Sequence, residues 1–127
     1  MLSVLVVEDH QAVREALVAA FLGWGHPVAS AATLQEALAL VDARSFNLVV
    51  TDVDLGGANG LDLVRSMRTS QPEVLFIVMS GRFGLKDILG SGIEAGDTLK
   101  YLRKPFLLSQ LQAAIGELVQ RNPATTR

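Results

Sequence analysis

Short runs of aliphatic residues alternate five times along this chain with segments whose apolar residues recur at helical spacing. The aliphatic runs, which we expect to be strands, lie at residues 2–7, 27–31, 46–51, 74–79 and 98–102. Parallel strands joined by right-handed helical crossovers are the usual outcome of such alternation, because each helix covers one face of the sheet. The sequence therefore predicts an α/β domain with a doubly wound, five-stranded parallel sheet. The run at 27–31 begins with proline, which favours the sheet edge.

The intervening segments predict amphipathic helices. The first has an apolar stripe at Val13, Ala16, Leu17, Ala20 and Phe21. The second begins after Thr33, which together with Glu36 has the spacing of a capping box. Glycines interrupt residues 81–96, so the fourth helix is expected to be short or weak. The last helix begins at Pro105, with a predicted buried face of Leu108, Leu111, Ile115 and Leu118.

Length and composition fit one domain, with residues 1–121 forming the fold and 122–127 a polar tail. A net charge of −2 provides no basic surface, which argues against direct binding of nucleic acid. Cysteine is absent, which excludes disulfides and thiolate chemistry and fits a reducing compartment. No segment reads as a signal peptide or a membrane span, so we expect a cytoplasmic protein without a membrane partner.

Acidic, hydroxyl and basic side chains stand where the predicted strands end. Glu8 and Asp9 follow the first strand, Asp52 the third, Ser80 the fourth and Lys104 the fifth. The carboxyl ends of parallel strands share one edge of the sheet, where ligands collect in open α/β folds. The sequence therefore predicts that these side chains converge there.

The predicted cluster has the composition of a site for phosphoryl transfer. Two carboxylates about 5 Å apart repel by roughly 3 kcal/mol at an effective dielectric constant of 20. Such a pair either raises one pKa or recruits a cation, and oxygen ligands of this kind suit Mg²⁺. A metal ion, a lysine and a nucleophilic carboxylate together suit attack by Asp52 on a phosphoryl group.

Four motifs, in order, extend these inferences to a family. They are Val4–Asp9, Val49–Asp52, Val78–Gly81 and Tyr101–Phe106. In this combination the chain resembles the receiver domain of two-component response regulators, from residue 2 to about residue 120. The resemblance implies a flavodoxin-like (βα)5 fold with strand order 2-1-3-4-5. It also implies a signalling phosphoprotein rather than an enzyme acting on a separate substrate.

By that resemblance, a sensor histidine kinase or phosphotransfer protein would phosphorylate Asp52. The resemblance also implies ligands for Mg²⁺: the side chains of Asp9 and Asp52, the backbone carbonyl of Asp54, and Glu8 through water. An effector domain or a downstream protein would receive the signal.

The resemblance further implies how the phosphoryl group would switch the face formed by residues 80–106. Lys104 would pair with phosphoryl oxygens, and the Lys104–Pro105 peptide bond would be cis. Ser80 would bind a phosphoryl oxygen through its hydroxyl, and Tyr101 would then move from an exposed to a buried position.

Three features depart from the family pattern or add to it. Gly56 and Gly57 replace the usual proline after the phosphoacceptor, which should loosen that loop. In relatives, the segment that corresponds to residues 81–96 holds the fourth helix, which is part of the surface that signals output. Because this segment is rich in glycine here, we do not assign the family's usual dimer surface to it. Asp54 and Arg82 flank the predicted site, and we hypothesise that they form an ion pair that slows attack of water on the phosphoaspartate.

Three other functions compete with this interpretation. A phosphatase of the haloacid-dehalogenase type would place Asp52-Val53-Asp54 on its first strand and would need room for a cap. A flavodoxin-like flavin binder would need a phosphate-binding first loop, which Glu8 and Asp9 would repel. A pseudo-receiver, a pure interaction module, would normally lack one of the acids or the lysine.

Overall fold

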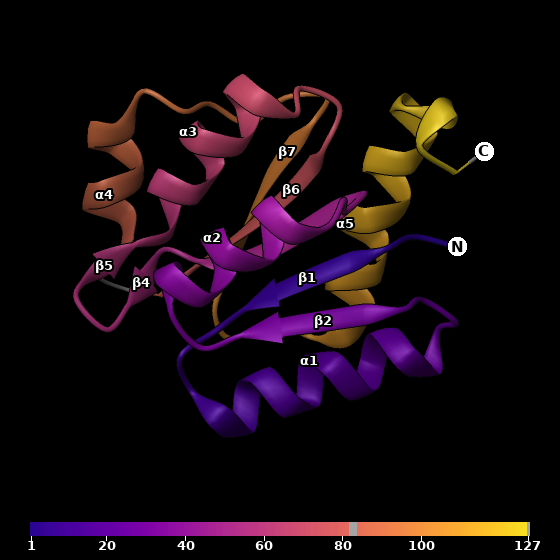
Figure 1. Ribbon diagram of the computed structural model, residues 1–127, viewed down its shortest axis with the longest axis horizontal. Coiled ribbons are helices and arrows are strands. Elements are labelled where there is room, and N and C mark those ends of the chain that lie inside the picture. Colours follow the sequence, from indigo (N-terminus) through magenta and orange to yellow (C-terminus); the bar gives the residue numbers. More distant parts are fainter. Residues whose placement is uncertain (82–83, 127) are drawn as a thin grey trace.

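A five-stranded parallel sheet forms the centre of the computed structural model, which describes residues 1–81 and 84–126 (Figure 1). Its strands are β1 (Val4–Val7), β2 (Val28–Ala31), β3 (Leu48–Asp52), β6 (Leu75–Ser80) and β7 (Leu99–Arg103). Their order is β2-β1-β3-β6-β7, with every neighbouring pair parallel. The predicted order 2-1-3-4-5 is therefore confirmed, because the labels β4 and β5 belong to a separate small hairpin.

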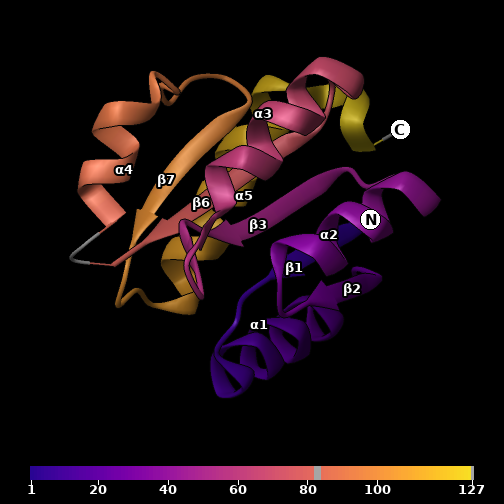
Figure 2. The same ribbon diagram turned by 60° about the vertical axis from the view of Figure 1, so that its left-hand side comes forward.

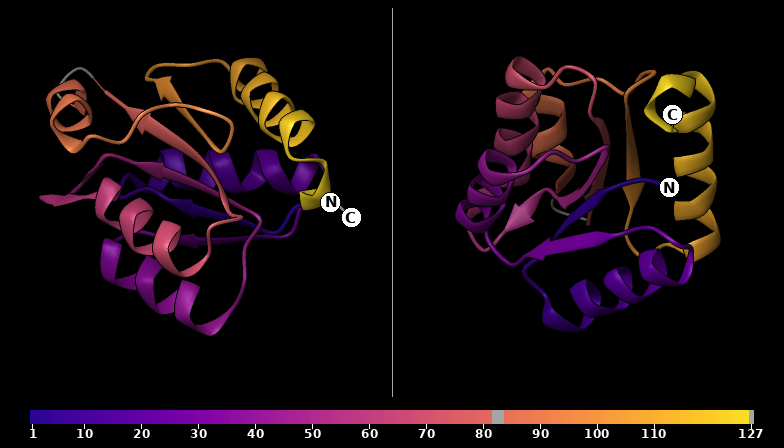
Figure 3. Two further views of the ribbon diagram at one scale, coloured as in Figure 1. Left: turned by 90° about the horizontal axis from the view of Figure 1, so that it is seen from above. Right: turned by 45° about the vertical axis from the view of Figure 1, so that its right-hand side comes forward.

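Helices cover both faces of the sheet (Figures 2 and 3). They are α1 (Gln11–Gly23), α2 (Leu34–Ala43), α3 (Gly60–Ser70), α4 (Gly84–Ser91) and α5 (Leu108–Arg121), followed by a 3-10 turn at Pro123–Thr126. The side chains of a strand alternate between faces. Val4 and Val6 therefore join the core under α1 and α5, whereas Leu5 and Val7 join the core under α2 and α3. No helix in the described ranges is both long and apolar enough to cross a membrane.

Local sequence signals explain where α2 begins and why α4 is short. The Thr33 hydroxyl accepts a hydrogen bond from the Glu36 amide, so the predicted cap of α2 is present. The Glu36 carboxylate accepts from the amide of Ala32, one residue before the position that a capping box would use. Helix α4 has eight residues, as short as its glycines predicted.

The predicted apolar stripes are only partly buried. Leu17 and Phe21 of α1 and Leu111, Ile115 and Leu118 of α5 are buried, as predicted. Val13 is 36% exposed, Ala16 is exposed and Leu108 is 48% exposed, so their assignment to the core was wrong. The reason is that these three side chains line an open groove between the first turns of α1 and α5.

The loop after β3 is an ordered hairpin. Strands β4 (Asp54–Leu55) and β5 (Ala58–Asn59) pair antiparallel around Gly56 and Gly57, whose φ angles are +62° and +96°. Positive φ at both central residues defines a type I′ turn, which glycine adopts without strain. The two glycines therefore build a hairpin where the sequence had suggested a loosened loop.

Candidate functional site

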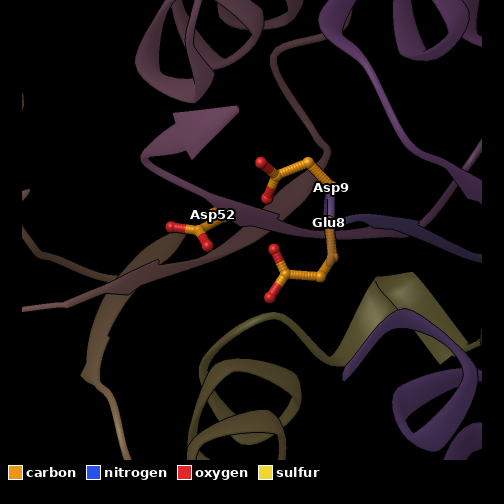
Figure 4. Close-up of side chains that lie close together, drawn as sticks. All are labelled: Glu8, Asp9 and Asp52. Atoms are coloured by element: carbon orange, nitrogen blue, oxygen red, sulfur yellow. The ribbon is translucent and has the colours of Figure 1, made fainter. Parts of the chain in front are cut away.

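Three carboxylates converge at the carboxyl edge of the sheet. Glu8 and Asp9 follow β1, and Asp52 ends the adjacent strand β3. One carboxylate oxygen from each of the three lies within 4.8 Å of the others, and Figure 4 shows the side chains of Glu8 and Asp9 extending toward Asp52. Glu8 is fully buried and Asp52 nearly so, whereas Asp9 is exposed. The predicted acidic cluster is therefore present, with one side open to solvent.

Lys104 supplies the positive charge of this cluster. Its Nζ atom donates to Glu8 Oε1 at 2.6 Å and to Asp52 Oδ2 at 2.5 Å. The backbone amide of Lys104 donates to the carbonyl of Ser80 at 2.8 Å, which extends the β6–β7 pairing by one step. The Lys104–Pro105 peptide bond is cis, as the resemblance implied. The lysine therefore bridges the two buried carboxylates.

Burial and charge shift the pKa values of this pair in a consistent way. Burial raises the pKa of Glu8 to about 7; Lys104 opposes this rise, and the neighbouring Asp52 adds to it. Burial would lower the pKa of Lys104, but its hydrogen bonds to Asp52 and Glu8 outweigh this effect, so the pKa is raised. Lys104 therefore remains charged at neutral pH, while Glu8 titrates near it.

The hairpin fixes the orientation of Asp52. The Asp54 amide donates to Asp52 Oδ1 at 3.1 Å, so each carboxylate oxygen of Asp52 has its own donor. The Gly60 amide donates to the carbonyl of Val53 at 2.7 Å, which ties the start of α3 to the end of β3. The side chain of Asp54 is exposed. The hairpin and Lys104 thus hold the Asp52 carboxylate at the open edge of the sheet.

Three further site residues were predicted from the sequence: Ser80, Tyr101 and Arg82. Ser80 ends β6 next to Asp52 and is buried, and its hydroxyl has no hydrogen bond to any residue that the structure describes. Tyr101 on β7 is half-buried; its hydroxyl donates to the carbonyl of Ile93 at 2.5 Å, and burial raises its pKa. Arg82 lies outside the described residues, so its ion pair with Asp54 stays a prediction.

The oxygen atoms of this site fit a hard divalent cation. Glu8 Oε2 is buried and has no hydrogen-bond partner among the described residues. A buried carboxylate oxygen without a partner is costly, and a metal-bound water would satisfy it. The exposed Asp9 and the buried Asp52 add carboxylate oxygens, the ligands that Mg²⁺ prefers. The donor set therefore suits Mg²⁺.

Two residues that shape the site were not found from the sequence. A Cβ atom on Gly60 would lie 1.9 Å from the carbonyl oxygen of Asp52, so only glycine allows this approach. The Asn59–Gly60 pair, which stands at the start of α3, is the sequence signal that could have indicated this close approach. Arg14 of α1 donates to the carbonyl of Glu8 at 2.9 Å, and no sequence pattern indicated this contact.

Comparison with known proteins agrees with this geometry. Residues 4–116 match the model of the response regulator receiver domain family. The KDP operon transcriptional regulatory protein KdpE of Escherichia coli (strain K12) is 36% identical over 126 residues, which are 99% of this chain and 55% of KdpE. The chain therefore spans about half the length of that relative.

Two solved structures share the fold. A response regulator receiver domain protein from Clostridium thermocellum superposes with a TM-score of 0.82 at 23% identity, covering 98% of both chains. The response regulator TrrA from Thermotoga maritima, in complex with Mg²⁺ and BeF, gives a TM-score of 0.78 at 24% identity, covering 93% of this chain and 99% of TrrA. Together with the family match over residues 4–116, these findings show that the chain belongs to the response regulator receiver domain family.

Proposed function

We propose that this chain is a Mg²⁺-dependent phosphoacceptor of two-component signalling, in which Asp52 receives a phosphoryl group from a phosphohistidine. The donor is a sensor histidine kinase or a phosphotransfer protein. One observation carries the proposal: the Asp52 carboxylate is paired with the Lys104 ammonium and clusters with the carboxylates of Glu8 and Asp9. A carboxylate held beside both a cation and a set of metal ligands has what phosphoryl transfer requires, namely position and charge neutralisation.

The transfer needs little from the protein besides orientation. An Asp52 carboxylate oxygen forms a bond to phosphorus as the bond from phosphorus to the histidine nitrogen breaks, and the imidazole leaves with its electron pair. The Asp54 amide and Lys104 hold the carboxylate in a fixed orientation before the donor arrives. Lys104 then neutralises charge on the phosphoryl oxygens. The chain is thus an acceptor that assists its own phosphorylation and the later hydrolysis of its phosphoaspartate.

Mg²⁺ would be held by the side chains of Asp9 and Asp52, by the Asp54 carbonyl, and by Glu8 through water. When bound, it supplies a second positive charge for the phosphoryl oxygens. The buried, unpartnered Glu8 Oε2 supports this assignment, as does the Mg²⁺–BeF complex of TrrA.

The switch is proposed to run from Ser80 to Tyr101. Ser80 is a buried residue at the end of β6, and its hydroxyl, which bonds to no residue that the structure describes, is available to bind a phosphoryl oxygen. Tyr101, on the neighbouring strand, already holds a hydrogen bond to the Ile93 carbonyl just beyond α4. Movement of the Ser80 loop would bias which position the tyrosine occupies, which is a population shift across the 80–106 face.

A groove beside the site suits the donor protein. It has a volume of about 630 Å³, and its lining consists of Ala12, Val13, Ala16, Leu17, Lys104, Pro105, Phe106 and Leu108. Lys104 belongs both to this lining and to the acidic cluster, so the groove adjoins the site of Asp52 through this lysine. We assign it to an amphipathic helix of the phosphodonor, whose apolar side chains flank its histidine.

Output is proposed to pass to an effector domain or a downstream protein, with residues 1–121 as the receiver domain and 122–127 as a polar tail. We also propose a cytoplasmic location, which is consistent with membership of the response regulator receiver domain family.

Phosphorylation by acetyl phosphate tests the proposal, because this small donor needs no partner protein. Intact mass should rise by one phosphoryl group with Mg²⁺ present, and should not rise with EDTA or in Asp52→Asn. Asp42→Asn, an exposed acid on α2, is the matched control and should be labelled like the wild type. Labelling that persists in Asp52→Asn would contradict the assignment of the acceptor. A wild-type chain that binds no Mg²⁺ and gains no mass would instead be a pseudo-receiver.

A further inference from the structure

Arg14 on α1 contacts the backbone that carries the two acidic side chains. Its Nη1 atom donates to the carbonyl oxygen of Glu8 at 2.9 Å and lies 3.5 Å from that of Asp9. Both carbonyls belong to the connection between β1 and α1. We infer that Arg14 is a positioning residue for metal binding, which rests on the proposed function, and that it acts by fixing this connection.

The geometry of the connection explains why such a contact is needed. Glu8 is buried, and the next residue, Asp9, is exposed, so a small rotation of the backbone between them would separate their carboxylates. The Glu8 amide is fixed by the carbonyl of Ala31 on β2 at 3.0 Å. The carbonyl of Glu8 is held instead by Arg14. The peptide units on both sides of Glu8 are therefore anchored, one by the sheet and one by the arginine.

The start of α1 provides little other support. Its N-cap residue, His10, makes no side-chain capping hydrogen bond, and the first turn contains no acidic residue. A capping side chain usually holds the backbone at this position. Such a cap would accept from the first amides of the helix, whereas Arg14, one turn into α1, donates to the carbonyls that precede it and ties the connection to the helix in that way.

The contacts of Arg14 indicate a geometric role rather than a role of its charge. Its guanidinium forms no ion pair with any carboxylate in residues 1–81 and 84–126. The nearest acid along its own helix, Glu15, instead accepts a hydrogen bond from Gln11. Lys104 already supplies the cation that pairs with Glu8 and Asp52. Removal of the Arg14 donors should therefore loosen the metal ligands without breaking an ion pair.

Calorimetric titration with MgCl₂ of the unphosphorylated protein tests this inference without using activity. Arg14→Met keeps the length and helix propensity of the side chain but removes its donors. The Mg²⁺ dissociation constant should rise about tenfold, in the range expected when a metal ligand loses its outer hydrogen-bond partner. Arg14→Lys keeps a donor and should restore most of the affinity. Arg121→Met, which removes the same charge at the far end of α5, should bind within twofold of the wild type.

The amide resonances of Glu8, Asp9 and His10 in ¹H–¹⁵N spectra provide a second readout, in the absence of metal. They should shift in Arg14→Met and return toward wild-type positions in Arg14→Lys. Equal Mg²⁺ affinity in Arg14→Met and wild type would overturn the inference. So would an equal loss in Arg14→Met and Arg121→Met, because the effect would then not depend on the contact between Arg14 and the β1–α1 connection. A wild-type protein that binds no Mg²⁺ would refute the proposed function itself. That result differs from the two outcomes above, in which the wild type does bind Mg²⁺.

Discussion

Lys104 Nζ lies 2.5 Å from Asp52 Oδ2, although Asp52 ends β3, Lys104 follows β7, and β6 lies between these two strands. The lysine therefore reaches across the carboxyl edge of the sheet to neutralise the proposed acceptor. Lys104→Met should lower the rate of labelling by acetyl phosphate about 100-fold, which is typical when a donor to developing negative charge is lost. The neighbouring exposed cation offers a control, because Arg103→Met should label like the wild type. Time-resolved intact mass measures both, and equal rates in the two variants would contradict the role of Lys104.

The raised pKa of Glu8 predicts how the stability of the metal-free protein depends on pH. The pKa of Glu8 rises from 4.5 to about 7 on folding. Between these pH values the folded protein keeps a proton on Glu8 that the unfolded chain has lost, and this proton binding contributes to the stability of the folded state. This contribution to stability is fully present below pH 4.5 and disappears as the pH rises through about 7. In EDTA, the urea midpoint of the wild type should therefore fall relative to that of Glu8→Gln between pH 5 and pH 8.

His26 provides the internal comparison for that experiment. Burial lowers its pKa, and its ring nitrogen accepts a hydrogen bond from the Leu2 amide at 3.0 Å. Its contribution is present above its ordinary pKa of 6.5 and is lost as the pH falls, the opposite direction to that of Glu8. Because His26 is present in both proteins, its effect cancels in the difference between wild type and Glu8→Gln. Parallel curves for the two proteins would show that Glu8 does not titrate near pH 7.

The sheet and the acidic cluster could be predicted because they depend on position along the strands. Aliphatic runs indicate buried parallel strands, and their carboxyl ends must share one edge, so Glu8, Asp9, Asp52 and Lys104 were expected to meet there. Each of the four lies within a residue or two of a strand end. A strand boundary that was wrong by one or two residues, as at Phe46, did not affect this result.

Features that depend on the approach of one segment to another could not be predicted in the same way. Helical periodicity placed Val13 and Leu108 in the core, but periodicity does not reveal whether a neighbouring helix covers the first turn. Gly56 and Gly57 suggested a loose loop, and only the pairing of the flanking residues makes it a hairpin. The Arg14 contact joins a helix to the loop before it, and a single arginine has no pattern.

The groove between α1 and α5 predicts a difference between protein donors and small donors. Leu108 lines this groove together with Lys104 and is 48% exposed, so a protein helix in the groove would cover it. Leu108→Asp should strongly slow transfer from a phosphorylated phosphotransfer domain, chosen because it labels the wild-type chain, yet leave labelling by acetyl phosphate within twofold. Leu22→Asp, also exposed but near the C-terminal end of α1, should affect neither donor. Equal transfer from the protein donor to Leu108→Asp and wild type would mean that the donor docks elsewhere.

Gly60 should be among the most sensitive positions outside the charged cluster, because its hydrogen atom faces the main chain of the acceptor. In Gly60→Ala the new methyl group would lie 1.9 Å from the Asp52 carbonyl oxygen and 2.9 Å from Thr51 Oγ1. Neither β3 nor α3 can move away without breaking the Gly60–Val53 hydrogen bond. We expect a loss of about 3 kcal/mol in the free energy of unfolding, at the upper end of overpacking costs. Gly116→Ala on α5 meets no atom within 4 Å and should instead stabilise the protein by up to about 1 kcal/mol. Urea unfolding measures both variants, and a Gly60→Ala midpoint equal to that of the wild type would show that the close approach of α3 to Asp52 is absent in solution.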